Sequence, residues 1–225
     1  MPHIAPVELA LRAEIVQVGS RLYQRGLIAA GDGNVSARLP DGTILITPAG
    51  LCKGELTPED LVVVDAEGRT LRAAPGRRPS SEQLLHLHVY RRRADIQACV
   101  HAHPPTAVAL TLAGVSMEQP LLPEALLALG PVPTAPYART GTAEMGQAVD
   151  PLLAQHETIL LSHHGAITLA ETPTAAYFRM EQLEHCARIL HAAYQIGPIR
   201  PLPAPRIAEL HALRAALRAH PEEVR

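Results

Sequence analysis

The sequence has 225 residues, 47% of them hydrophobic and 19% charged, which is typical of a folded globular chain and excludes a largely disordered one. At about 150 residues per domain, this length favours one domain over two. The formal net charge of −2 and the lack of any apolar run near the roughly 20 residues of a membrane span argue against nucleic acid and membrane as partners.

The start of the chain predicts a helix rather than a secretory signal. Met-Pro-His-Ile leads to Glu8 without a charged start followed by an apolar core. Over 6–26, apolar residues recur at helical spacing and the run ends at a glycine. The three cysteines are too few and too scattered for a disulfide framework or a four-thiolate zinc site, which fits a reducing compartment. We therefore expect a cytoplasmic protein.

Turn residues next mark short strands and the start of a second helix. Two apolar runs, 35–39 and 43–47, are joined by Pro-Asp-Gly and predict a β-hairpin, and 61–65 predicts a third strand. Ser80 and Ser81 then precede a helical pattern over 83–93. We expect a serine to cap this helix and to leave its first N–H groups facing outward.

Helices and strands continue to alternate to the end of the chain. Further helices are predicted at 106–112, 142–153, 173–196 and 206–219, and further strands at 96–103, 158–161 and 166–169, with a linker over 198–205. The order is not a strict βαβ alternation. It predicts an α/β fold in which helices cover a mixed, mainly antiparallel sheet, as one domain in three layers.

The basic residues are unusual, because 19 are arginine and only Lys53 is lysine. A mechanism through a lysine Schiff base would have to use Lys53.

Histidines supply the main indication of a metal site. His101 and His103 lie two apart on a predicted strand, so both rings point to one face about 7 Å apart along the backbone. A third imidazole from the turn at His163 and His164 would complete a three-histidine site with an open position, as in catalytic zinc centres. One of these two should face the metal, and the other should pack or bond the backbone.

Other side chains near these histidines have weaker claims. Cys99 shares the strand face of His101, so a thiolate ligand is conceivable, although an ordinary buried cysteine is the stronger interpretation. His86 and His88 lie on the helix, where residues two apart diverge by about 200° and cannot chelate together. We expect them to pack or to lie at the surface. Glu82 is the candidate general base, because it is an acid at the start of a helix in a chain whose histidines indicate a metal. Without the histidines, Ser-Ser-Glu would indicate only a helix cap.

Three clusters of small or hydroxyl residues could bind an anion. They are Gly31-Asp32-Gly33-Asn34, Ala49-Gly50 and Ser80-Ser81. Together, their backbone amides and hydroxyls could cradle a phosphate without lysine, whereas each alone is an ordinary turn. The sequence has no Walker motif, dinucleotide fingerprint or G-x-S-x-G elbow.

Six motifs occur together in one order along the chain. They are Gly33-Asn34-Val35-Ser36-x-Arg38, Ile46-Thr47-Pro48-x-Gly50, Ser80-Ser81-Glu82, Val100-His101-x-His103, Ala135-Pro136-Tyr137 and His163-His164-Gly165. In this order they resemble the class II aldolase/adducin family, over about residues 8–200. The resemblance implies one domain over 1–225, with 206–219 as its C-terminal helix. It also implies an α/β/α sandwich and a homotetramer with active sites between subunits.

The resemblance also implies roles for individual residues. The metal ligands, normally to zinc although another divalent cation is possible, would be His101, His103 and His164. The catalytic acid/base would be Glu82. The substrate phosphate would be held by Asn34, Gly50, Ser80 and Ser81.

Two positions depart from the fuculose-1-phosphate aldolase branch, which the chain resembles most. Ala49 stands where that branch has a threonine, so one hydroxyl for the phosphate is missing. Over 121–125 the chain has no tyrosine, where those enzymes supply one to the adjacent subunit as proton donor. Glu124 is a hypothetical replacement, against the plain interpretation of a solvated glutamate at a helix start.

The resemblance implies an enzyme, a metal-dependent aldolase and carbon–carbon lyase. It would reversibly cleave a phosphorylated ketose, such as L-fuculose 1-phosphate, to dihydroxyacetone phosphate and an aldehyde through a zinc-stabilised ene-diolate. The alternatives are a phosphosugar dehydratase, decarboxylase or epimerase on the same scaffold, and a non-catalytic adducin-like domain. The epimerase branch carries aspartate where this chain has Glu82. Retention of three histidines and Glu82 argues against the non-catalytic reading.

Overall fold

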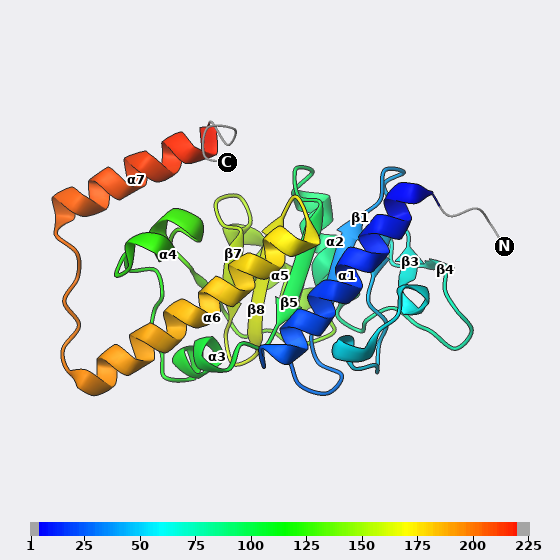
Figure 1. The fold of residues 1–225 in the computed structure, drawn as a ribbon, viewed down its shortest axis with the longest axis horizontal. Coiled ribbons are helices and arrows are strands. Elements are labelled where there is room, and N and C mark those ends of the chain that lie inside the picture. The colour runs from blue at the N-terminus through cyan, green and yellow to red at the C-terminus, as the bar shows by residue number, and fades with distance from the viewer. Residues whose placement is uncertain (1–4, 220–225) are drawn as a thin grey trace.

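A computed structural model describes residues 5–219 (Figure 1). The first four residues, on which the interpretation of the N-terminus rests, and the last six of the predicted 1–225 domain lie outside this range. Within it, eight strands form one sheet in the order β4-β3-β2-β1-β5-β8-β7-β6. The strands are β1 Asn34–Arg38, β2 Ile44–Ile46, β3 Val62–Val64, β4 Thr70–Arg72, β5 Ala98–Ala102, β6 Thr134–Ala135, β7 Thr158–Leu161 and β8 Gly165–Ala170.

All neighbouring strands pair antiparallel except β6 and β7, which run parallel. The predicted mixed, mainly antiparallel sheet is therefore confirmed. The helices are α1 Pro6–Gln24, α2 Gln83–Arg92, α3 Pro105–Leu112, α4 Pro123–Ala128, α5 Ala143–Val149, α6 Pro173–Ile196 and α7 Ala204–Ala219.

Helices cover both faces of the sheet, as the three-layer prediction requires. α1, α3 and α6 pack on one face, and α1 and α6 cross it side by side in front of the strands (Figure 1). α2 and α5 pack on the other face through residues such as Leu85 and Met145. The sandwich is held by two apolar cores, one on each side of the sheet.

The alternation of residues on β1 and β5 decides which face carries the polar groups. Val35 and Val100 pack under α1 and α6. Asn34 pairs with His101 and Ser36 with Cys99 across the two strands. Cys99 belongs to the core under α2, so these four side chains face that helix. The central strands thus deliver polar groups to the side on which Glu82 precedes α2.

The structure differs from the predicted elements at several places. β4 and β6 were not predicted, and α4 was anticipated only through the interpretation of Glu124 as lying at a helix start. α5 ends at Val149 and is followed by a 3₁₀ turn over Asp150–Leu152. The expected serine cap of α2 is wrong: Glu82 occupies the N-cap position and no side chain caps the helix. Instead, Oγ of Ser80 accepts a hydrogen bond of 3.3 Å from the N–H of Glu82.

α7 begins two residues before the prediction and lies apart from the sheet, along α4 (Figure 1). It has no buried residue. Arg214 ties it to the body, because Nη2 donates to the carbonyl of Leu129 at 3.2 Å and the guanidinium lies against Gly130. None of the helices in 5–219 has the length and apolar composition needed to cross a bilayer.

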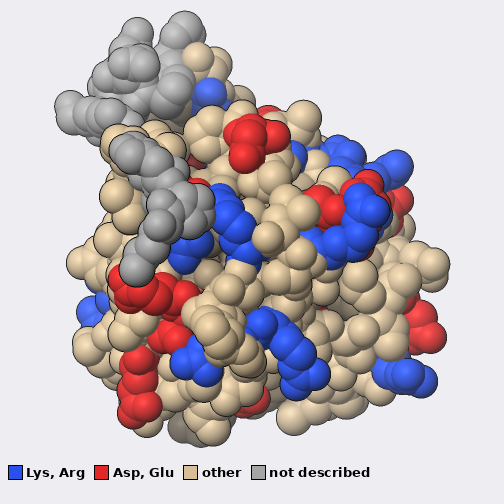
Figure 2. All heavy atoms as spheres, turned by 90° about the vertical axis from the view of Figure 1, so that its right-hand side faces the viewer, with Lys and Arg blue, Asp and Glu red and all other residues tan. Residues whose placement is uncertain are grey.

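Charged side chains of both signs are interspersed on the face that carries the N-terminal part of the chain (Figure 2). This face offers no broad basic surface of the kind that nucleic acids bind.

Candidate metal centre and active site

His101 and His103 come from the end of β5, near the centre of the sheet. His101 is fully buried, and its Nδ1 lies 2.9 Å from the carbonyl oxygen of Ala166 on β8. Because a carbonyl only accepts, Nδ1 donates this hydrogen bond, and Nε2 is the ring nitrogen that faces the other clustered side chains. Nε2 of His103 lies 3.1 Å from this Nε2. Two strand residues therefore aim ring nitrogens at one point.

The third imidazole comes from the turn between β7 and β8. His163 has a φ of 60° and forms a 2.9 Å contact with the hydroxyl of Ser162, away from the other rings. His164 instead turns inward, with its ring centroid 4.7 Å from that of His101 and 4.9 Å from that of His103. Of the two alternatives left by the sequence, His164 is the one that joins the cluster.

Gly165 makes this convergence sterically possible. A Cβ at this position would lie 2.4 Å from the carbonyl oxygen of Ala102, 2.8 Å from Cδ2 of His103 and 3.1 Å from Cε1 of His101. Real side chains do not tolerate the shortest of these separations. The glycine after His164 is therefore required by the packing of the imidazoles.

Glu82 brings a carboxylate to the three rings from the start of α2. Its Oε2 lies 3.1 Å from Nε2 of His101, and its Oε1 lies 3.3 Å from Nε2 of His164. The amide of Asn34 donates to Oε2 at 3.1 Å. Burial raises the pKa of Glu82, but the charges and hydrogen bonds of His101 and His164 outweigh burial and lower it overall.

The four side chains fit a divalent cation. One donor atom from each of Glu82, His101, His103 and His164 lies within 4.8 Å of the other three. Burial, followed by the charges of His101 and His164, lowers the pKa of His103 to about 4, so this ring is neutral at pH 7 and can act as a ligand. Lone pairs packed this closely need positive charge between them. Nitrogen and carboxylate donors are the set that Zn²⁺ takes in catalytic sites.

The loops expected to bind phosphate meet beside this cluster. Pro48 and Pro79 form an isolated antiparallel bridge, and the N–H of Ser80 donates to the carbonyl of Thr47 at 3.1 Å. This pairing brings the Gly50 loop and the Ser80-Ser81 segment together. Ser80 is buried, whereas Gly50, with a φ of +74°, and Ser81 are exposed.

Asn34 links the phosphate loops to the acid/base candidate. It is buried, and while its amide nitrogen donates to Glu82, its Oδ1 has no hydrogen-bond partner among the described residues. The loops of Gly31 and Gly50 are neighbours, because a Cβ on Gly31 would lie in van der Waals contact with the carbonyl carbon of Gly50, at 3.9 Å. Asn34, Gly50, Ser80 and Ser81 thus come from segments that the fold places together.

Glu124 lies elsewhere in the chain. It is exposed in the first turn of α4, where its carbonyl accepts a 3.4 Å contact from Gln182 and its charge acts on Cys186. In the described part of one chain, it makes no contact with the four clustered side chains. Any part for Glu124 in proton transfer would therefore have to be played in a neighbouring subunit.

The other candidates from the sequence have structural roles. Burial raises the pKa of the Cys99 thiol to about 12, and Cys99 is not among the donor atoms that converge in the cluster, so the structure gives it the role of an ordinary buried cysteine. His88 pairs with Asp150 at 2.8 Å. His86 is fully buried and contacts the hydroxyl of Ser36 at 2.6 Å. Both helical histidines pack, as expected.

The buried network behind the cluster was not foreseen. The hydroxyl of Ser36 also contacts that of Tyr90 at 2.8 Å, and Nε2 of His86 has no partner among the described residues. Burial, followed by the charge of His101, lowers the pKa of His86 to about 3. Two spacings could have indicated it, since His86 lies one helical turn after Glu82 and Ser36 lies two strand residues after Asn34.

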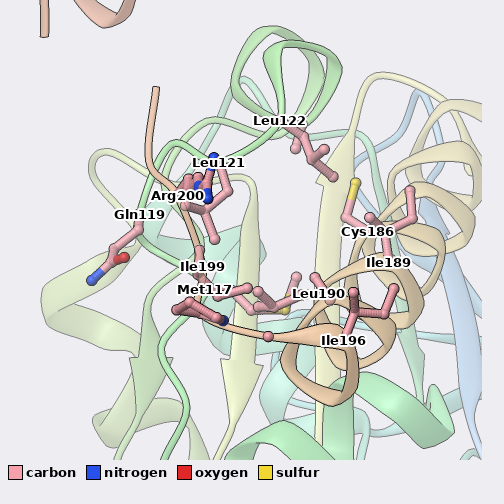
Figure 3. Close-up of a pocket in the computed structure, with 14 residues that line it drawn as sticks. Met117, Gln119, Leu121, Leu122, Cys186, Ile189, Leu190, Ile196, Ile199 and Arg200 are labelled. Atoms are coloured by element: carbon pink, nitrogen blue, oxygen red, sulfur yellow. The ribbon is translucent and has the colours of Figure 1, made fainter. Parts of the chain in front are cut away.

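An apolar cavity of about 500 Å³ lies apart from the histidines (Figure 3). Side chains from the C-terminal half of α6, such as Leu190 and Ile196, line one side, and Met117 and Leu121 line the other. None of its lining residues belongs to the histidine and glutamate cluster. The candidate active site is therefore the cluster of Glu82 and the three histidines, and this cavity is a separate feature of the chain.

Comparison with known proteins agrees with this arrangement. Residues 13–191 match the model of the Class II Aldolase and Adducin N-terminal domain. The chain belongs to the class II aldolase/adducin family.

Among individual relatives, the 3-oxo-tetronate 4-phosphate decarboxylase of Escherichia coli O6:H1 is 38% identical, over 93% of this chain and 99% of the relative. The 5-deoxy-D-ribulose 1-phosphate aldolase of Bacillus thuringiensis serovar kurstaki is 34% identical, over 88% and 92%. A solved L-fuculose 1-phosphate aldolase superposes with a TM-score of 0.83 at 28% identity, over 93% and 97%.

Proposed function

We propose that this chain is a divalent-metal-dependent decarboxylase of a phosphorylated 3-oxo sugar acid of the 3-oxo-tetronate 4-phosphate type. Similarity to the decarboxylase over nearly the full length of both chains supports this choice. It favours one of the alternatives left open by the sequence over the aldolase expected first. The observation in the site on which this proposal depends is that a single carboxylate able to transfer a proton, that of Glu82, lies beside the three histidines.

The reaction can be written from the structure of the substrate class. The bond between C1 and C2 breaks, CO₂ leaves, and its electron pair remains on C2 and the C3 carbonyl as an ene-diolate. A proton that originates from water is then added to C2, which gives dihydroxyacetone phosphate and consumes one proton for each CO₂ released. Aldol cleavage of a ketose 1-phosphate passes through the same ene-diolate, with an aldehyde leaving in place of CO₂. One scaffold can therefore serve both reactions.

The lack of a tyrosine over 121–125 helps to decide between decarboxylation and aldol cleavage. Release of an aldehyde requires a second group to take the proton from the C4 hydroxyl, whereas CO₂ leaves without a proton transfer. The chain has no tyrosine over 121–125, and Glu124 lies away from the cluster within its own chain. A site with one acid/base suits decarboxylation better than aldol cleavage.

In this proposal, each group of the chain has a defined task. His101, His103 and His164 hold the cation, which when bound supplies Lewis-acid stabilisation of negative charge on the substrate oxygens. Glu82, a carboxylate in the resting site, takes a proton from water and passes it to C2, and Asn34 orients this carboxylate through the 3.1 Å hydrogen bond. The phosphate is held by the amide of Asn34, the backbone of Gly50 and the hydroxyls of Ser80 and Ser81.

Product analysis tests the proposed function. Purified protein loaded with Zn²⁺ is incubated with 3-oxo-tetronate 4-phosphate, and CO₂ and dihydroxyacetone phosphate are measured together. We expect equal amounts of both, and loss of both after chelation or in Glu82→Gln. No CO₂ release, while the protein cleaves a ketose 1-phosphate, would overturn the decarboxylase.

An aldolase is the second candidate, because the 34% identical relative acts as one and shares most of its length with this chain. The same assay with L-fuculose 1-phosphate and 5-deoxy-D-ribulose 1-phosphate detects it through dihydroxyacetone phosphate formed without CO₂. Glu124→Gln separates the two further, since only aldol cleavage needs a second proton-transfer group. A non-catalytic protein would bind no metal and release neither product.

Assembly and location complete the proposal. By resemblance to the family we expect a cytoplasmic homotetramer with sites between subunits, and the three cysteines of the described chain are free, as in a reducing compartment. Light scattering of the purified protein measures the number of subunits. A stable monomer with full activity would contradict the shared site.

A further inference from the structure

The only lysine of the chain is buried beneath the loops assigned to the phosphate. Lys53 begins a 3₁₀ turn after β2 and is 2% exposed. Its ammonium donates to the carbonyl of Gly31 at 2.6 Å and to that of Leu51 at 2.9 Å. Gly31 lies in the loop before β1, and Leu51 follows Gly50. One side chain therefore holds both loops.

The surroundings fix this lysine firmly. Gly19 of α1 packs so closely on its backbone that a Cβ there would lie 2.5 Å from the carbonyl oxygen of Lys53. Glycine at position 19 therefore lets α1 pack directly against the backbone of Lys53. The loops of Gly31 and Gly50 are neighbours, since a Cβ on Gly31 would lie at an ordinary van der Waals distance of 3.9 Å from the carbonyl carbon of Gly50.

A buried ammonium is unfavourable without compensation. Burial lowers the pKa of Lys53, and the charges of Asp32, Cys52 and Glu82 act in the opposite direction. The two carbonyls satisfy two of its three N–H groups. The positive charge of the Lys53 ammonium, held against the backbones of both loops, would complement an anion bound to the same loops.

We propose that Lys53 is a positioning residue that joins loops 31–34 and 49–51 into one cradle for the substrate phosphate and places a positive charge beneath it. This inference rests on the proposed function only in assuming a phosphorylated ligand. Lys53 does not touch the reacting carbons, and it forms no Schiff base. It shapes the binding of the phosphate rather than the chemistry at C2.

Replacement by methionine keeps most of the stem but removes the charge and the tie between the loops. Inorganic phosphate serves as the probe, and its binding to the Zn²⁺-loaded protein is measured by calorimetry without turnover. We expect Lys53→Met to weaken the binding of inorganic phosphate and to raise the KM for 3-oxo-tetronate 4-phosphate, each by about tenfold or more. Metal content should be unchanged and kcat should stay within about threefold, because Glu82 and the histidines remain in place.

Arg12→Met is the matched control. Arg12 is also a buried cation, and it donates to the carbonyls of Pro58 at 2.6 Å and Leu61 at 3.2 Å, away from the phosphate loops. This variant should lose stability yet bind phosphate like the wild type. Phosphate binding within twofold of wild type in Lys53→Met, or equal losses in both variants, would overturn the role of Lys53.

A measurement on the unchanged protein avoids any dependence on folding of the variant. With a single lysine in the sequence, labelling with ¹³C-lysine gives one side-chain NMR signal. We expect this signal to shift as inorganic phosphate is added, with the affinity found by calorimetry. No shift, or no phosphate binding, refutes the inference. If phosphate shifts this signal but the protein releases no CO₂, the role of Lys53 in phosphate binding is supported and the proposed decarboxylase activity is rejected.

Discussion

The carboxylate of Glu82 lies 3.1 Å from Nε2 of His101, so the candidate acid/base and a proposed metal ligand face each other across the centre of the site. Glu82 is brought there by the start of α2 and His101 by the end of β5. In the proposed function, proton transfer and charge stabilisation would therefore be supplied from opposite sides of one small space.

Changing Glu82 to glutamine should remove proton transfer while leaving the imidazoles in place. We expect turnover to fall by about 10²–10⁴-fold, with bound metal retained, because a positioned acid/base contributes a factor of this size. Steady-state rates and metal analysis measure both effects. Glu124→Gln is the control, and it should keep the decarboxylation rate; full activity of Glu82→Gln would refute its assignment.

The two adjacent histidines of the β7–β8 turn allow a paired test of the metal centre. His164→Ala should lower metal content and rate together, because its ring faces His101 and His103. His163→Asn should change neither, since His163 points to Ser162 and asparagine tolerates its φ of 60°. Metal per chain is read by atomic absorption. An active, metal-replete His164→Ala protein would contradict the site.

Gly165→Ala should weaken metal binding without altering any ligand. The added Cβ would meet the carbonyl oxygen of Ala102 at 2.4 Å and the ring of His103 at 2.8 Å, so the imidazoles must shift. Loss of ligand orientation typically costs about 10–100-fold in metal affinity. Gly197→Ala is the control, because a Cβ there meets nothing within 4 Å. Equal affinities in the two variants would show that Gly165 has no such role.

His86 should make the metal-free protein less stable in acid. Its pKa is lowered to about 3 mainly by burial, so below the ordinary value of 6.5 only the unfolded chain takes up this proton. Stability contributed by the neutral ring is full above pH 6.5 and declines as the pH falls toward 3. Between pH 6.5 and pH 5 the loss is about 2 kcal/mol.

Urea unfolding in the presence of a chelator measures this loss. His86→Gln removes the titrating group but keeps a polar partner for Ser36. The difference in free energy of unfolding between wild type and variant should therefore shrink by about 2 kcal/mol over this pH range. A difference that stays constant with pH would show that His86 is protonated in the folded protein as readily as in the unfolded chain.

Much of the site could be predicted because it follows local rules. The two-residue spacing of His101 and His103 on a strand fixed their common face, and the structure places both rings at one point. The choice between His163 and His164 could not be made from spacing, since it depends on the positive φ of His163. The pairing of Pro48 with Pro79, which joins two loops, is a long-range contact that no local pattern encodes.

The fold likewise divides into elements that a local sequence pattern predicts and elements that are too short or too exposed to have one. Long periodic helices such as α6 were predicted with correct ends, and the hairpin of β1 and β2 followed from its turn residues. β6 has two residues and α4 has six, which is too short for a pattern to emerge. β4 has largely exposed residues and so lacks the apolar alternation that marks a strand.

The ends of the sheet have a consequence for aggregation. β4, at one edge, has three residues beside a register shift at Val63 and Val64, and β6, at the other, has two residues between Pro133 and Pro136. Short, irregular edges with nearby prolines offer few free N–H groups to a foreign strand. Concentrated solutions of the protein should therefore resist edge-to-edge stacking into β-rich fibres, despite the eight strands inside each molecule.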